Sequence, residues 1–167
     1  MIYHKELFTN PEKTARTIIN LCNNISASEG IYFRELAENI INPNIKNNTI
    51  EELKYLSIRL RPMIRYTLDV DGIELLKEPI RFIEELNTRG YIIGDCDDIT
   101  LFSNLVLKMI GYNCGCKIIK MDNDDYFGHI YSVVSIEGKY YPFDLSTDEP
   151  IGYEYYKIKE YKIFIEE

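Results

Sequence analysis

The chain has 167 residues, of which 46% are hydrophobic and 28% are charged. This length suits one domain around one hydrophobic core, and the composition is that of an ordinary globular protein. The formal net charge of -8 argues against a nucleic-acid surface, which would need clustered lysines and arginines. No apolar run is long enough to span a bilayer and the first residues lack a signal-peptide pattern, so we expect no membrane segment and a cytoplasmic protein.

The first half of the chain is predicted to be helical. Asn10 followed by Pro11 is typical of a helix start, and the residues after it carry apolar side chains at helical spacing. A similar pattern follows, and then Thr49 with Glu52 predicts a capping box ahead of another helix. Pro62 should kink that helix or end it early.

The most apolar helical pattern is DDITLFSNLVLKMI, and Gly111 ends it. Because apolar residues surround this segment on most sides, we expect it to be buried. Beyond Gly111 the pattern alternates, and we expect strands over the segments CGCKIIKM, GHIYSVVSIEG, KYYPFDLS and YEYYKIKEYKIFIEE. The predicted fold class is therefore α+β in one domain, 1–167. Its N-terminal part, 1–88, is helical, and in its core, 89–167, a central buried helix packs on an antiparallel sheet.

Four cysteines leave two interpretations open. Without a signal peptide, reduced thiols are expected at Cys22, Cys96, Cys114 and Cys116. Cys114 and Cys116 should point to the same face of a strand, which favours core packing. The alternative is a zinc site built from Cys96, Cys114, Cys116 and His129, although the Cys-x-Cys spacing is unlike the usual zinc knuckle.

Three residues far apart in the sequence are candidates for one catalytic site. Cys96 lies at the start of the buried helix, where unpaired N–H groups and the helix dipole stabilise a thiolate. His129 opens one predicted strand and Asp144 lies on the next, so antiparallel pairing can set them side by side. An imidazole can activate the thiol, and a carboxylate can fix the tautomer of that imidazole.

The carboxylates next to the thiol complicate this hypothesis. Asp97 and Asp98 suit the first turn of a helix, but their charge should raise the pKa of Cys96. We therefore expect their side chains to point away from the thiol, into N–H groups or basic partners, and to anchor the loop. The basic partners considered are Arg61, Arg65 and Arg89.

The segment GDCDDITLFSNLVLKMIGYNCGCKII, followed by GHIYSVV and YYPFDLS, resembles the transglutaminase-like superfamily of papain-like cysteine acyl-transfer domains, in its compact bacterial and phage form. The resemblance implies a papain- or transglutaminase-like core with Cys96 as nucleophile, His129 as general base and acid, and Asp144 as the orienting acid. It also implies acyl transfer or hydrolysis at an amide or peptide carbonyl through a thioester, with a peptide or protein as substrate.

The same resemblance implies an oxyanion hole that includes the backbone N–H of Cys96. Tyr91 is the candidate for the second donor, and Asp95, Asp97 and Asp98 are the candidates for supporting residues. A tryptophan lines the site in many relatives, whereas this chain contains none.

No metal or organic cofactor is implied by this interpretation. The alternative from another class is a non-catalytic structural or assembly module, for instance in a phage virion, which would bind protein partners and be virion-associated. The 14 tyrosines, concentrated near the C-terminus, fit either a half-exposed sheet or a protein interface.

Overall fold

The structure is a computed structural model that describes residues 3–6, 10–68 and 74–165. Its helices are α1 (Pro11–Asn23), α2 (Ala27–Ile40), α3 (Ile50–Leu60), α4 (Pro79–Arg89) and α5 (Cys96–Ile110), with a 3-10 turn over Arg61–Met63. Its strands are β1 (Tyr3–Glu6), β2 (Ile64–Tyr66), β3 (Glu74–Lys77), β4 (Ile92–Gly94), β5 (Asn113–Met121), β6 (His129–Ile136), β7 (Lys139–Phe143) and β8 (Ile158–Ile165).

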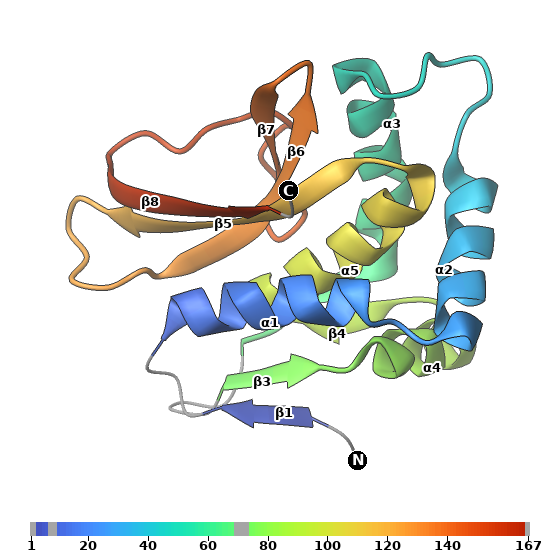
Figure 1. Cartoon of the computed structure of the whole chain (residues 1–167), viewed down its shortest axis with the longest axis horizontal. Helices are drawn as coiled ribbons and strands as arrows, with labels where there is room; N and C mark the ends of the chain where they lie inside the picture. Colours follow the sequence, from blue (N-terminus) through green and yellow to red (C-terminus); the bar gives the residue numbers. More distant parts are fainter. Residues whose placement is uncertain (1–2, 7–9, 69–73, 166–167) are drawn as a thin grey trace.

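The main sheet has four strands in the order β7-β6-β5-β8, and all its neighbours are antiparallel. Helix α5 packs against β5 and β6, and α1 packs against both α5 and β5 (Figure 1). Helices α2 and α4 cover other sides of α5. A central helix on an antiparallel sheet confirms the predicted α+β class.

The predicted helix starts agree with the structure, with one difference. Asn10 caps α1, because its side-chain oxygen accepts hydrogen bonds from the N–H groups of the first turn. The hydroxyl of Thr49 accepts from Glu52 N at 3.1 Å, as a capping box requires. In a capping box the Glu52 side chain would also accept from the backbone N–H of Thr49. Here Glu52 Oε2 accepts instead from Asn48 N, one residue earlier, at 2.8 Å. As predicted, α3 ends just before Pro62.

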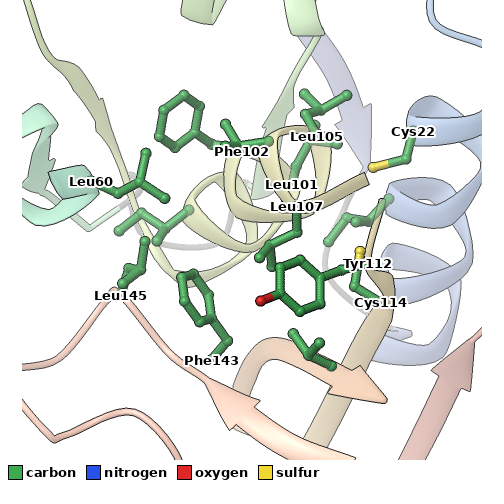
Figure 2. Close-up of a cluster of buried hydrophobic side chains, with 14 of the residues drawn as sticks. Cys22, Leu60, Leu101, Phe102, Leu105, Leu107, Tyr112, Cys114, Phe143 and Leu145 are labelled. Carbon is green, nitrogen blue, oxygen red and sulfur yellow. The ribbon is translucent and has the colours of Figure 1, made fainter. Parts of the chain in front are cut away.

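Helix α5 lies at the centre of the hydrophobic core. Phe102 on α5 packs edge-on against Phe33 of α2 and Phe82 of α4, with ring centroids 6.4 and 5.7 Å away. Cys114 and Cys116 of β5 are buried in the same core, which confirms their packing role. Figure 2 shows Cys114 among these side chains. Within the described ranges, no helix is both long enough and apolar enough to cross a membrane.

Two short strand pairs were not predicted from the sequence. Strand β1 pairs with β3 in antiparallel fashion, and β2 pairs with β4 in parallel. Pro62 was expected to kink or end the helix, but no strand was expected after it, and Ile64–Tyr66 are extended. The β2–β4 register places Tyr66 opposite Gly94, two residues before Cys96. This pairing therefore brings an unexpected side chain to the candidate site.

Candidate active site

Cys96 is the first residue of α5, and a single residue, Asp95, separates it from the end of strand β4. The turn between the two elements is tight, and a Cβ atom added at Gly94 would lie 2.5 Å from Cβ of Asp98. The glycine of the Gly-Asp-Cys sequence is therefore required by the close packing of Asp98. Cys96 is thus the first residue of a long, buried helix, and the N-terminal end of a helix stabilises a nearby anion such as a thiolate.

Cys96 and His129 line one cavity of about 170 Å³. Its lining comes from α1, from β2 and Leu68 after it, from β5 and β6, and from the loop that connects those two strands. That loop supplies Tyr126, Phe127 and Gly128 immediately before His129. The structure thus brings the predicted thiol and the predicted imidazole to the same hollow.

Asp144 lies against His129, and the sheet explains why. Strands β6 and β7 pair so that Ser132 is opposite Phe143. Asp144, the next residue, therefore lies near the start of β6. Its Oδ2 atom is 2.7 Å from Nε2 of His129, so the predicted imidazole–carboxylate contact is formed.

The carboxylate of Asp144 is buried and densely hydrogen-bonded. Its Oδ1 accepts from the backbone N–H of Ser146 at 2.9 Å and from the hydroxyl of Ser146 at 2.6 Å. Its Oδ2 also accepts from the hydroxyl of Tyr155 at 2.7 Å. Burial alone would raise the pKa of Asp144, but the bonds from His129, Ser146 and Tyr155 hold that pKa below its ordinary value of 3.8.

Two tyrosines that sequence reasoning did not assign to the site surround His129. The ring of Tyr155 is 5.4 Å from the imidazole in an edge-on arrangement, and its hydroxyl is 3.3 Å from Nε2. The ring of Tyr131 is 5.5 Å from the imidazole, and its hydroxyl donates to Glu154 at 2.7 Å. Burial and the Asp144 carboxylate raise the pKa of Tyr155, so it stays a hydrogen-bond donor. The only sequence signal was the density of tyrosines near the C-terminus.

The cationic partner of Asp98 is a lysine, not one of the arginines considered. Asp98 Oδ1 accepts from Lys77 N at 2.9 Å, and its Oδ2 lies 3.6 Å from Lys77 Nζ. Nζ also lies 3.2 Å from Oε1 of Glu85. Asp98 therefore anchors β3 to the start of α5, as expected of a supporting residue. Arg61 instead donates to the carbonyl of Asp144 at 3.3 Å.

Tyr66 lies on the cavity wall beside the candidate nucleophile, whereas Tyr91 lies elsewhere. The guanidinium carbon of Arg65 lies 4.9 Å from the centroid of the Tyr91 ring, and Tyr91 is absent from the described residues that line the cavity. Tyr66 lines the cavity together with Cys96 and His129. Burial, and then the negative charges of the site, raise the pKa of Tyr66 to about 12, so it carries its proton at neutral pH.

Asp95, Asp97 and Asp98 form the one group of potential metal ligands detected in the described part of the chain, with ligand atoms within 4.8 Å of one another. Carboxylate oxygens suit hard cations such as Ca²⁺ and Mg²⁺, but the ammonium group of Lys77 already places a positive charge beside Asp98. The zinc alternative needed Cys114 and Cys116 at the cavity. Both thiols instead lie in the core, so this alternative is wrong.

No family model and no curated protein matches the sequence. Among solved structures, the chain is similar to one described as "a Putative Cysteine Protease from Cytophaga hutchinsonii", with 15% sequence identity and a TM-score of 0.49. The match covers 84% of this chain and 46% of that one, so this chain spans about half the length of its neighbour. A likeness at this level assigns neither family nor function.

Proposed function

We propose that this chain is a cysteine-dependent acyl-transfer or hydrolytic domain of the transglutaminase-like kind, acting on amide or peptide carbonyls through a thioester. One observation carries the proposal. Cys96 and His129 line the same cavity, and Nε2 of that histidine is 2.7 Å from the buried carboxylate of Asp144. A thiol, an imidazole and an orienting carboxylate are the parts that nucleophilic thiol catalysis needs.

The first step is activation of the thiol. Because Nε2 of His129 donates its proton to Asp144, Nδ1 is the nitrogen left to accept one. Transfer of the Cys96 thiol proton to Nδ1 gives a thiolate and an imidazolium. The N-terminal end of α5 stabilises the first, and the Asp144 carboxylate stabilises the second.

The second step is transfer of the acyl group. The thiolate attacks the carbonyl carbon, so a C–S bond forms and the carbonyl oxygen becomes an anion. When this intermediate collapses, the C–N bond breaks and Nδ1–H of His129 protonates the leaving amine. Water or another amine then gives its proton to Nδ1 and attacks the thioester, which releases the acyl product and restores the thiol of Cys96.

The carbonyl oxygen needs two donors while it is negatively charged. The backbone N–H of Cys96 is one donor. We assign the hydroxyl of Tyr66 as the second in place of Tyr91, because Tyr66 lines the cavity and is protonated at neutral pH.

Alkylation with iodoacetamide tests the proposal. The rate at which Cys96 is modified is followed by mass spectrometry in the native chain, in the chain unfolded in urea, and in His129→Asn. We expect native Cys96 to react at least about tenfold faster than both references, because a thiolate is the reacting form. Equal rates in all three samples would refute the proposal and favour the non-catalytic assembly module.

A further inference from the structure

We infer that the cavity beside Cys96 binds an uncharged, apolar side chain of leucine to phenylalanine size, close to the carbonyl that is attacked. This inference rests on the proposed function and narrows it to a substrate class. It distinguishes this chain from an enzyme that selects glutamine.

The lining of the cavity is the first argument. Ile118 of β5 and Ile130 of β6 form a buried floor, and Tyr126, Phe127 and Leu68 form the walls and the rim. Tyr126 is 68% exposed and Leu68 is 76% exposed, so large apolar side chains face solvent at the mouth. Apolar surface that is left open next to a reactive group is typical of a ligand site.

The size of the cavity is the second argument. Its volume is about 170 Å³. An apolar cavity of about 150 Å³ in another protein accommodates benzene, so this hollow is large enough for one branched aliphatic or aromatic side chain. It is too small for several residues to be buried together. The cavity therefore accepts one side chain while the rest of a peptide lies outside.

Charge is the third argument. Among the described residues that line the cavity there is no lysine or arginine, and the carboxylate present is that of Asp95. The nearby ammonium group of Lys162 lies 5.4 Å from the centroid of the Phe127 ring and forms an ion pair with Glu12. An acidic side chain would thus meet the Asp95 carboxylate and, among the described lining residues, no lysine or arginine.

A glutamine side chain would also be disfavoured. Its amide carries an oxygen acceptor and two N–H donors, and each needs a partner once it is removed from water. The lining is mostly apolar, and three of its polar side chains, Cys96, His129 and Tyr66, are engaged with the carbonyl in the proposed reaction. The other polar side chains that line it are those of Thr14, Asp95 and Tyr126, so an amide meets few partners. An apolar side chain of the same length gains free energy from the same burial, so we expect at least about a tenfold preference for it.

Binding is measured on the Cys96→Ser variant, which removes the thiol so that the probes remain intact. The probes are the peptide amides acetyl-Ala-X-Gly-Gly-amide, where X is norleucine, phenylalanine, glutamine or glutamate. Norleucine and glutamine have side chains of matched length. Each peptide is titrated into ¹⁵N-labelled protein, and the dissociation constant is taken from the amide shifts of Tyr126, Gly128 and Ile130.

We expect norleucine and phenylalanine peptides to bind at least about tenfold more tightly than glutamine and glutamate peptides. Tyr126→Ala should reduce the difference several-fold. Tyr156→Ala is the matched control, because Tyr156 is similarly exposed at 71% and does not line the cavity. Equal affinities for norleucine and glutamine, or shifts confined to other parts of the chain, would overturn the inference.

The two proposals fail in different ways. A slow thiol in the iodoacetamide experiment, with apolar selectivity retained here, would refute the catalytic function and leave an apolar peptide site. A fast thiol with no selectivity among the four peptides would retain the catalytic function and refute the apolar side-chain site.

Discussion

Replacement of Asp144 by asparagine gives the sharpest test of how the site is held together. Two donors, Nε2–H of His129 and the hydroxyl of Tyr155, both lie 2.7 Å from Oδ2. The N–H and hydroxyl groups of Ser146 both reach Oδ1. A carboxylate accepts all four bonds. An amide has one oxygen, so its NH₂ group must face donors on one of the two sides.

The expected cost follows from this mismatch. At least one buried donor loses its acceptor, which costs about 1–3 kcal/mol, and the remaining bonds lose the assistance of a charge. We therefore expect Asp144→Asn to lower the free energy of unfolding at pH 7 by about 2–4 kcal/mol.

The difference should also depend on pH. The folded-state pKa of Asp144 lies below its ordinary value of 3.8. A carboxylate with a lowered pKa stabilises the folded state fully above the unfolded-state pKa, and this stabilisation is lost as pH falls through the folded-state pKa. Asparagine does not titrate. The gap between the wild type and Asp144→Asn should thus be widest near neutral pH and shrink below pH 3.8.

Urea unfolding followed by circular dichroism at several pH values from neutral to below 3.8 measures this gap. Asp148→Asn is the matched control, since the side chain of Asp148 is exposed and lies 4.0 Å from Arg61. We expect the control to change the free energy of unfolding by less than about 1 kcal/mol. A gap for Asp144→Asn that stays constant or widens in acid would refute the assigned hydrogen-bond network.

Three further substitutions test the supports of the site. Gly94→Ala would place Cβ 2.5 Å from Cβ of Asp98. This substitution should lower the free energy of unfolding by about 1–3 kcal/mol. The control Gly30→Ala, which has open space around it on α2, should not destabilise the chain. Equal thermal midpoints for the two variants would contradict this expectation. Lys77→Met removes the cation beside Asp98 and should lower the free energy of unfolding by about 3–5 kcal/mol, with partial recovery in the double variant with Asp98→Asn. A double variant that is less stable than Lys77→Met alone would show that Lys77 does not compensate the charge of Asp98. Tyr66→Phe should slow release of the amine from a peptide anilide about 100-fold. It should leave the rate of iodoacetamide alkylation unchanged, because alkylation forms no oxyanion. Equal losses in both rates would exclude Tyr66 as the oxyanion donor.

Local sequence signals predicted the parts of the fold that short-range chemistry determines. The start of α1 at Asn10, the end of α3 before Pro62 and the αL cap of α5 at Gly111 all agree with the structure. Each depends on a side-chain cap, a missing N–H group or a positive φ angle, which one or two residues decide. The contact between His129 and Asp144 followed from the same logic, because hairpin-connected strands are neighbours.

Long-range pairing determined what the sequence did not predict. Strand β2 has only three residues, Ile64–Tyr66, and its parallel partner β4 is also three residues long. Strands this short show no measurable alternation, and parallel pairing has no turn signature of its own. The sequence therefore pointed to Tyr91, close to Cys96 along the chain, whereas the fold brings Tyr66 to the cavity.

The acidic residues beside the thiol show how a cation from another element can compensate one charge in a cluster of carboxylates. Asp98 is 1% exposed and faces Lys77, so a cation on β3 compensates its charge. Asp95 precedes the helix and lines the cavity. If all three carboxylates acted on Cys96, they would oppose formation of a thiolate. The arrangement instead assigns Asp98 to joining β3, β4 and the start of α5, which fixes the direction in which the first turn presents the thiol. A site that needs one negative charge on sulfur tolerates a neighbouring carboxylate more easily when a cation compensates it, and Lys77 is that cation for the carboxylate packed against Gly94.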